Sequence, residues 1–403
     1  MDPYSALRHA NFRRYATGNI LSIIGMQAQD VAVGWELYER THSAMALGLV
    51  GLVEILPVLL LTFPAGHAAD RFDRRRIVLF TQAIAVLCSL ALAAISHAHG
   101  PVAAYYALLF VGATSRAIRN PAVSSLLPQL VPERDFSNAV TWNSSIFQIG
   151  SVAGPALGGL LIGVAKAAAP VYWVAAAFAL WHFGFVWALR TVAAARKREE
   201  VNWRTLLAGL RFVLQTRIIL ASITLDMFAV LLGGAATLLP IYAKDILHVG
   251  PSGLGWLRAA PSVGAALMAV SVAHRPPMRR AGRTLILAVA GFGVVTVVFG
   301  LSRSFWLSMS MLFLLGAVDN ISVIVRQSLV QLRTPDHLRG RVSAVNSLFV
   351  GASNQLGGFE SGAVAQLFGP VASVVAGGVG SILVVAAVAC LWPELRNLGT
   401  LRE

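Results

Sequence analysis

Long apolar runs separated by short polar segments dominate the chain. About twelve of these runs reach roughly twenty residues, the length at which an α-helix crosses a hydrocarbon core of about 30 Å. The pattern therefore predicts an all-α polytopic membrane protein with twelve transmembrane helices. The predicted spans are 15–37, 45–68, 77–97, 102–125, 138–163, 169–189, 218–240, 252–273, 284–302, 305–327, 342–365 and 370–392.

Composition agrees with this pattern, because 57% of the 403 residues are hydrophobic and only 12% are charged. The net charge of +14 could suggest a nucleic-acid partner, but the apolar runs leave no folded soluble module to carry a basic face. We therefore expect no nucleic-acid binding. Cys88 and Cys390 lie inside apolar runs, so we expect neither a disulfide framework nor a metal cluster.

The basic residues follow the predicted loops. With the N-terminus inside, few of the 32 Lys and Arg residues fall in outer segments, and these are Arg40, Lys166, Lys244 and Arg303. This asymmetry obeys the positive-inside rule and places both termini in the cytoplasm, with the protein in the cell inner membrane.

The two halves of the chain are related by a weak repeat. A shift of about 203 residues aligns Pro132 with Pro335, Asn143 with Asn346, Gly154 with Gly357 and Gly159 with Gly362, and a shift of 204 aligns Gly51 with Gly255. These matches favour a duplicated six-helix unit. We expect an N-terminal six-helix bundle (1–190), a basic, amphipathic cytoplasmic linker on the membrane surface (191–217) and a C-terminal six-helix bundle (218–403).

A charged motif lies between the spans 45–68 and 77–97. It runs from Gly66 through Asp70 and Arg71 to Arg74 and Arg75. Glycine permits close helix approach, and the Asp70 carboxylate can accept hydrogen bonds from the free N–H groups at the start of a neighbouring helix. Arginines alone would satisfy the positive-inside rule, whereas the Gly–Asp spacing is not required by it.

A glycine motif lies in the span 138–163. Gly150, Gly154 and Gly158 follow one another at intervals of four, which makes a smooth ridge for a partner helix. Pro155 removes one backbone hydrogen bond and can bend the helix, and Gly159 extends the small-residue surface.

With these motifs, the chain resembles the major facilitator superfamily over essentially its whole length, and within it the bacterial branch of the enterobactin exporter and related drug-efflux proteins. The resemblance implies two pseudo-symmetric six-helix bundles that work by alternating access. It also implies that Gly66, Asp70, Arg71, Arg74 and Arg75 form a conformational latch, and that the glycine motif is the one typical of exporters that exchange substrate for protons. The chain departs from the pattern at Asp73, where many members have Gly, and near Leu109, where proton-driven relatives carry a basic residue.

Charged residues inside the predicted spans are candidates for function, because each costs about 2.5–3.5 kcal/mol at the bilayer centre by insertion scales. Asp30 and Glu54 are the predicted proton-coupling residues, since a carboxyl group in an apolar cavity can take up and release a proton. Arginine stays protonated, so Arg116 and Arg119 are expected to bind an anionic group or to neutralise a carboxylate. The predicted substrate cavity comprises Arg116, Arg119, Asp226, Arg258, Asp319, Asn143, Asn346 and Gln355. The repeat gives Glu54 and Arg258 equivalent places, and likewise Arg116 and Asp319, which could form ion pairs across that cavity.

The sequence therefore predicts a secondary-active, proton-coupled exporter of small organic molecules such as drugs or siderophores, and not an enzyme. Its partners are a small-molecule substrate, protons and membrane lipid; it needs no cofactor or metal, and it is expected to be monomeric. The sequence contains no Walker-type phosphate-binding loop, which argues against direct coupling to ATP. The alternatives are a gradient-independent facilitator, a lipid or metal-ion exporter on the same scaffold, and a non-transporting membrane receptor.

Overall fold

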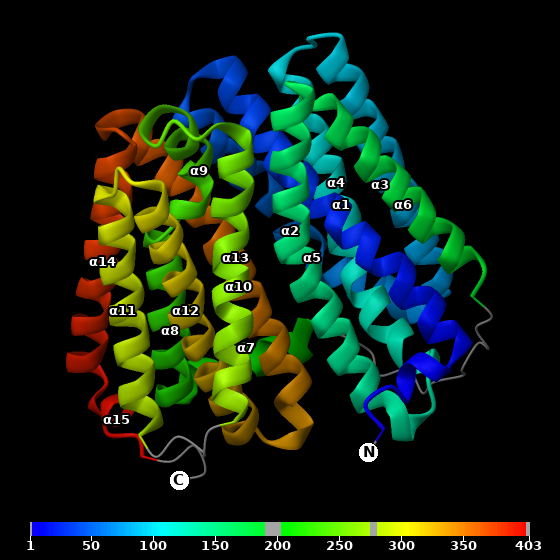
Figure 1. Ribbon diagram of the computed structural model, residues 1–403. Coiled ribbons are helices and arrows are strands. Elements are labelled where there is room, and N and C mark those ends of the chain that lie inside the picture. Colours follow the sequence, from blue (N-terminus) through cyan, green and yellow to red (C-terminus); the bar gives the residue numbers. More distant parts are fainter. Residues whose placement is uncertain (1, 190–202, 275–279, 400–403) are drawn as a thin grey trace. The chain divides into compact units, whose positions relative to one another are not determined.

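The computed structural model describes residues 2–189, 203–274 and 280–399, and these residues form helices and connecting turns without any β-strand. They divide into two compact units (Figure 1). Unit 1 comprises Met1–Arg40, Val53–Val201 and Gly250–Ala259, and unit 2 comprises Thr41–Leu52, Asn202–Val249 and Ala260–Glu403.

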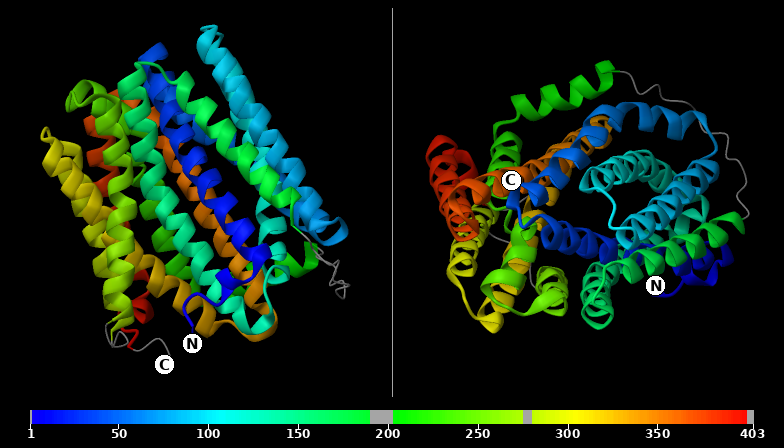
Figure 2. Two further views of the ribbon diagram at one scale, coloured as in Figure 1. Left: turned by 45° about the vertical axis from the view of Figure 1, so that its right-hand side comes forward. Right: turned by 90° about the horizontal axis from the view of Figure 1, so that it is seen from above.

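Unit 1 is built from the first six long helices, apart from the start of the second, and from the segment Gly250–Ala259. These six helices coincide with the first six predicted spans. They are α1 (Ala10–Thr41), α2 (Ala44–Arg71), α3 (Arg74–His97), α4 (Val102–Leu126), α5 (Phe136–Ala165) and α6 (Ala169–Trp187). Helix α3 packs along both α4 and α6, as two further views show (Figure 2). Phe12, Val78, Leu126 and Val186 belong to one buried cluster that joins α1, α3, α4 and α6.

Unit 2 holds the remaining helices. They are α7 (Trp203–Gln215), α8 (Arg217–Leu232), α9 (Leu239–Ile241), most of α10 (Gly250–Ala273), α11 (Ala281–Leu301), α12 (Phe305–Arg333), α13 (Arg339–Phe368), α14 (Pro370–Leu391) and α15 (Pro393–Arg396). Helix α11 packs along α12 and α14. Leu225, Leu285, Val325 and Val385 are fully or largely buried where α8, α11, α12 and α14 meet.

The predicted span 218–240 is not one continuous helix, which corrects the expectation from the sequence. Helix α8 ends at Leu232, and the chain continues through Gly233 and Gly234 into a 3₁₀ turn (Ala235–Leu238), α9 and a π-type turn (Tyr242–Ile246). Two adjacent glycines weaken the helix. They also let the backbone approach α13, because a Cβ on Gly234 would lie 2.5 Å from the carbonyl oxygen of Gly357.

Helix α7 covers the second part of the predicted linker, whereas 190–202 lie outside the described residues. Val213 on α7 is buried against Ile219 of α8, Val330 of α12 and Val342 of α13. The described part of α7 therefore packs on α8, α12 and α13 within unit 2. The predicted place of this segment at the membrane surface stays a prediction.

Within the described ranges, nine helical segments are long and apolar enough to cross a membrane. Helices α1, α4 and α13 lie outside that set although they contain 32, 25 and 30 residues. Each carries charges in its interior, with Asp30 on α1, Arg116 and Arg119 on α4 and Glu360 on α13. Together with the charged residues inside α2, α8, α10 and α12, these positions are where a function that needs charge inside the membrane is sought.

Helices α2 and α10 each contribute residues to both units. Their N-terminal parts make glycine contacts that correspond to one another in the sequence repeat. In unit 1 a Cβ on Gly159 of α5 would lie 2.7 Å from the Cα of Gly255 on α10. In unit 2 a Cβ on Gly48 of α2 would lie 3.0 Å from the Cα of Gly362 on α13. Gly159 and Gly362 are partners in the sequence repeat, so equivalent positions make the same kind of backbone contact.

Candidate functional site

An ion pair joins α2 and α4 inside unit 1. Arg116 donates from Nη2 to Oε1 of Glu54 at 2.5 Å. The Glu54 side chain is 13% exposed and that of Arg116 is 33% exposed, so the pair is only partly shielded. A charge-assisted bond of this length is among the stronger hydrogen bonds in proteins.

Asp30 on α1 completes this arrangement. Its carboxylate lies within electrostatic range of Glu54, Arg116 and Arg258, the last of which comes from the part of α10 that belongs to unit 1. Among the residues that the structure describes, Asp30 has neither a hydrogen-bond nor an ion-pair partner within 4.0 Å. We refer to these four residues as the unit 1 charge cluster: Asp30, Glu54, Arg116 and Arg258. The structure thus brings both predicted proton-coupling residues together with two residues of the predicted substrate cavity.

Arg119, one turn beyond Arg116, belongs to a second polar group in unit 1. It donates from Nη2 to Oδ1 of Asn19 at 3.2 Å, and Asn19 donates to Asn143 on α5 at 3.3 Å. Tyr15 and His182 are buried within electrostatic range of Arg119. The Tyr15 hydroxyl, both ring nitrogens of His182 and Nε of Arg119 have no partner in the described part of the chain. Unsatisfied donors around a buried cation suit a water molecule or an anionic group.

The glycine ridge of α5 faces α1. A Cβ on Gly154 would lie 2.7 Å from the carbonyl oxygen of Ile24, and one on Gly158 would lie 2.7 Å from that of Ala28. Gly150 approaches the side chain of Ile23 in the same way, and Pro155 lies between these contacts inside α5. The ridge therefore fixes α1 directly before Asp30, just as the contact between Gly159 and Gly255 fixes α10 three residues before Arg258.

Unit 2 contains a more deeply buried ion pair, between Asp226 on α8 and Arg326 on α12. The two side chains are 5% and 3% exposed. Asp226 also lines a small cavity with Asp319 and Ser322 of α12 and with apolar residues of α8 and α11. The cavity has room for about one water molecule, so it cannot hold an organic substrate. We refer to Asp226, Asp319 and Arg326 as the unit 2 charge cluster.

The other residues predicted for the substrate cavity lie on α13. Asn346 is half-buried, and its Oδ1 atom has no hydrogen-bond partner within the described ranges. Gln355 is also half-buried, and its main chain lies against Gly51. Neither residue lines the small cavity of the unit 2 charge cluster.

The loop motif is only partly described. Gly66 and Asp70 lie within α2, but the side chain of Asp70 is outside the described set, and so is its predicted latch contact. Asp73 caps α3 by accepting a hydrogen bond from the backbone N–H of Arg75 at 2.9 Å. This explains how an aspartate fits where many relatives have glycine.

The basic residues of the motif differ in their surroundings. Arg75 donates from Nε to the carbonyl oxygen of Val186 at 3.1 Å and from Nη2 to that of Trp187, so it caps the C-terminus of α6. Arg71 is exposed and Arg74 is half-buried. Arg75 therefore has a structural role within unit 1 in addition to the latch role that the resemblance implies.

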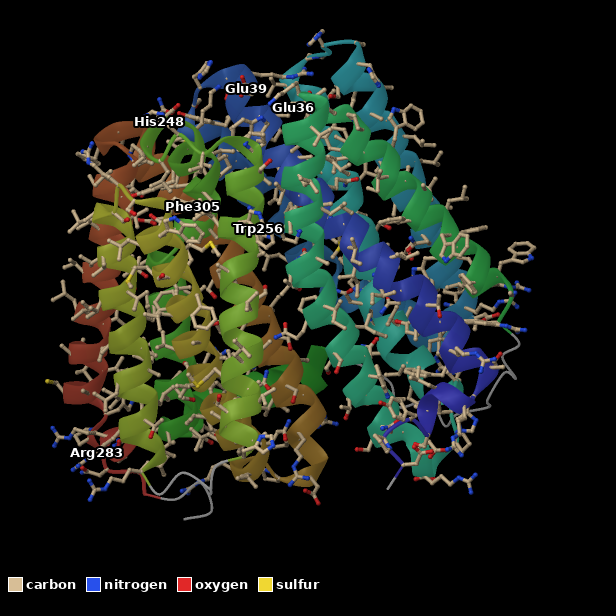
Figure 3. All side chains as sticks on the ribbon, in the orientation of Figure 1. Glu36, Glu39, His248, Trp256, Arg283 and Phe305 are labelled. Atoms are coloured by element: carbon tan, nitrogen blue, oxygen red, sulfur yellow. The ribbon has the colours of Figure 1, made fainter. Side chains whose placement is uncertain are left out.

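A polar network that was not predicted from the sequence lies near the end of α1, where Glu36 and Glu39 are found (Figure 3). Glu36 is 7% exposed and accepts hydrogen bonds from Arg40 at 2.5 Å, Ser96 at 2.8 Å and Tyr172 at 2.9 Å. It ties α1 to α3 and α6, beside an open pocket of about 370 Å³. The spacing of four between Glu36 and Arg40 was the available signal.

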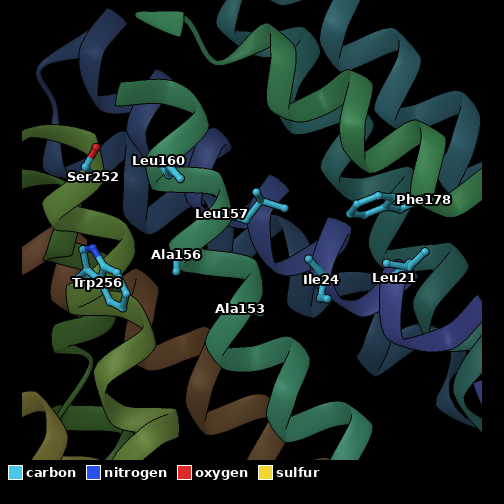
Figure 4. Close-up of a pocket in the computed structure, with 9 residues that line it drawn as sticks. All are labelled: Leu21, Ile24, Ala153, Ala156, Leu157, Leu160, Phe178, Ser252 and Trp256. Carbon is cyan, nitrogen blue, oxygen red and sulfur yellow. The ribbon is translucent and has the colours of Figure 1, made fainter. Parts of the chain in front are cut away.

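Another pocket of unit 1 is apolar. It has a volume of about 490 Å³ and is lined by α1, α5, α6 and the start of α10 (Figure 4). Leu157, Phe178 and Trp256 form much of its wall, and Ser252 supplies the hydroxyl group. None of the residues predicted for the substrate cavity lines it. Among the described side chains, no three of His, Cys, Asp or Glu gather in a way that could hold a metal ion.

Long helices in two units, glycine-mediated helix contacts and paired charges within the spans define a polytopic membrane transporter of the major facilitator fold. Solved structures agree with this fold. The nucleoside transporter NupG superposes with a TM-score of 0.76 at 11% identity, covering 95% of this chain and 99% of its own. A bacterial homologue of the human lysosomal transporter Spinster gives a TM-score of 0.75 at 14% identity, covering 98% of both chains.

The chain belongs to the transmembrane secretion effector family of this superfamily, which matches residues 1–400. It is 28% identical over 384 residues to the multidrug efflux pump Tap of Mycolicibacterium fortuitum, covering 91% of this chain and 92% of the relative. It is 24% identical over 392 residues to the enterobactin exporter EntS of Escherichia coli K12, covering 96% of this chain and 93% of the relative. Both the family and the fold are those of transporters, so the protein is not an enzyme.

Proposed function

We propose that this protein is a proton-coupled exporter, an antiporter that moves small organic molecules such as drugs or siderophores out of the cell. The observation that carries the proposal is the unit 1 charge cluster, in which Asp30 has no direct partner and Glu54 is held by Arg116. The names of Tap and EntS support the direction of transport and the kind of substrate.

Proton binding and the ion pair exclude one another at Glu54. A proton on the Glu54 carboxylate removes its charge and weakens its hold on Arg116. Arg116 is then available to neutralise Asp30, since a guanidinium stays protonated, and neither carboxylate can hold a substrate group. When the proton leaves, Arg116 returns to Glu54, and the Asp30 carboxylate can again bind a cationic or hydrogen-bond-donating group of the substrate. A substrate and a proton that compete for the same partners are the requirement for exchange.

The orientation belongs to the same proposal. Both termini face the cytoplasm and the protein lies in the cell inner membrane, as the distribution of Lys and Arg indicates. The proton gradient supplies the energy, no cofactor takes part, and a single chain is the working unit.

The decisive experiment measures efflux of a panel of dyes and siderophores from proteoliposomes with an imposed pH gradient. We expect Asp30→Asn or Glu54→Gln to abolish the response to the gradient. Glu394→Gln is the matched control, because it removes one carboxylate from an exposed ion pair with Arg217. Gradient-independent efflux in the wild type and all variants would instead identify a facilitator, and binding without any flux would identify a receptor.

A further inference from the structure

Asp319 is an intramembrane carboxylate without a countercharge. It lies on α12, two turns before Arg326, but Arg326 is engaged by Asp226 of α8. Throughout the described residues, Asp319 has no hydrogen-bond or ion-pair partner. The unit 2 charge cluster thus contains one neutralised pair and one additional carboxyl group.

The cavity beside Asp319 contains a second unsatisfied group. Ser322, one turn further along α12, is 2% exposed, and its hydroxyl has no hydrogen-bond partner among the described residues. It lines the same cavity as Asp226 and Asp319. A buried hydroxyl is rarely left without a partner in a native protein, so this one indicates something that the cavity takes up.

The lining shows what could neutralise Asp319. Helix α8 contributes Asp226, α12 contributes Asp319 and Ser322, and α11 contributes only the apolar Ala288, Val289 and Phe292. Helix α10 approaches α12 through Gly264 and Gly316, and neither α10 nor α13 adds a charged side chain to the lining. No basic group of the lining therefore faces Asp319.

An ionised carboxylate in such a place is costly unless a cation joins it. A metal cation such as calcium or magnesium collects about six or more oxygen ligands. The cavity offers side-chain oxygens from three residues only, and it has room for about one water molecule. A proton satisfies the charge without needing further ligands.

We infer that Asp319, Ser322 and Asp226 form a proton-binding site in unit 2, separate from the unit 1 charge cluster. The proton bonds covalently to one oxygen of Asp319. The resulting carboxylic acid donates a hydrogen bond to the Ser322 hydroxyl, directly or through one water molecule. This inference adds a second proton site to the proposed function, but proton binding at Asp319 does not require that unit 1 couples protons to transport.

Infrared difference spectroscopy tests the site without measuring transport. Purified full-length protein in detergent micelles and sodium-free buffer is taken from acidic to alkaline pH, and the C=O stretch of protonated carboxyl groups is recorded. We expect a band from one carboxylic acid in apolar surroundings that is present near neutral pH in the wild type and in Asp30→Asn, and that is lost in Asp319→Asn. Ser322→Ala should shift its frequency because the hydrogen bond is removed.

The outcomes are distinct from those of the efflux experiment. The same band in Asp319→Asn as in the wild type would overturn the inference, and so would a band that sodium ions abolish, because a metal cation would then be the occupant. If Asp319→Asn does not fold, Asp319→Glu and Ser322→Ala still decide, since both must change the frequency of the band. Loss of gradient-driven efflux in Asp30→Asn with the band intact would support both proposals independently.

Discussion

The charge clusters of the two units share a common core in different settings. Each has one carboxylate paired with an arginine of another helix and one additional aspartate, and unit 1 has a second arginine, Arg258. In unit 1 the pair of Glu54 and Arg116 is partly exposed, whereas in unit 2 the pair of Asp226 and Arg326 is almost completely enclosed. A partly exposed pair can exchange partners with a proton or a ligand, while an enclosed pair is held by its surroundings. Under the proposed function, the unit 1 pair therefore exchanges partners, whereas the enclosed pair of unit 2 is a fixed frame beside one additional carboxyl group.

The largest effect should come from breaking the enclosed pair. Arg326→Met leaves Asp226 buried without its partner, which we expect to destabilise the protein by about 3–5 kcal/mol. The double variant Asp226→Leu/Arg326→Met should recover most of that loss, because no charge then remains unpaired. Thermal unfolding in detergent, followed by circular dichroism, checks both. If Arg326→Met is as stable as the wild type, the ion pair of Asp226 and Arg326 is not the fixed frame of unit 2.

Glycine packing is a feature that the two units share, and it can be tested in parallel. Gly154→Ala in unit 1 and Gly357→Ala in unit 2 each place a Cβ 2.7 Å from a carbonyl oxygen of a neighbouring helix. We expect a loss of about 1–3 kcal/mol for each, measured as a lower midpoint of thermal unfolding. Gly184→Ala and Gly351→Ala are matched controls, because a Cβ at either position meets nothing within 4 Å. Equal stability of all four variants would contradict the role of these contacts.

A smaller effect on stability is expected at the exposed pair. Glu54→Gln keeps one hydrogen-bond acceptor for Arg116, whose side chain is 33% exposed, so we expect a loss of about 1–2 kcal/mol. The same unfolding measurement should therefore separate Glu54→Gln clearly from Arg326→Met. If the two variants lose equal stability, the difference in burial between the pairs has no energetic meaning and the comparison fails.

The smallest effect concerns the end of α6. Arg75→Ala removes the donor to the carbonyl oxygens of Val186 and Trp187, which should cost about 0.5–1 kcal/mol. Arg76→Ala is the control, because the Arg76 side chain is 87% exposed and meets only Asp73 at 3.8 Å. A Tm measured for both variants tests whether Arg75 acts within unit 1; identical values would leave only the latch role that the resemblance implies.

The fold could be predicted from the sequence because bilayer thickness sets the length of each apolar run. Helix α8 is the exception, since apolar residues continue past Gly233 and Gly234 while the backbone does not continue as a helix. The charged residues of the spans could also be found, but not their partners. The repeat suggested Arg258 for Glu54, whereas the structure pairs Glu54 with Arg116, because partner choice depends on how helices rotate about their axes. Asp226 and Arg326 have no spacing that relates them, so that pair is visible only in three dimensions.

The enclosed ion pair of unit 2 also sets an order of events during synthesis. Helix α8 leaves the ribosome with Asp226 well before α12 brings Arg326, and a lone carboxylate is poorly tolerated in lipid. We therefore expect Asp226 to be neutral, or to be shielded by the insertion machinery, until α12 arrives. Unit 2 can complete its assembly only after most of the chain has been made, whereas α4 delivers Arg116 to Glu54 while the first half is still being translated.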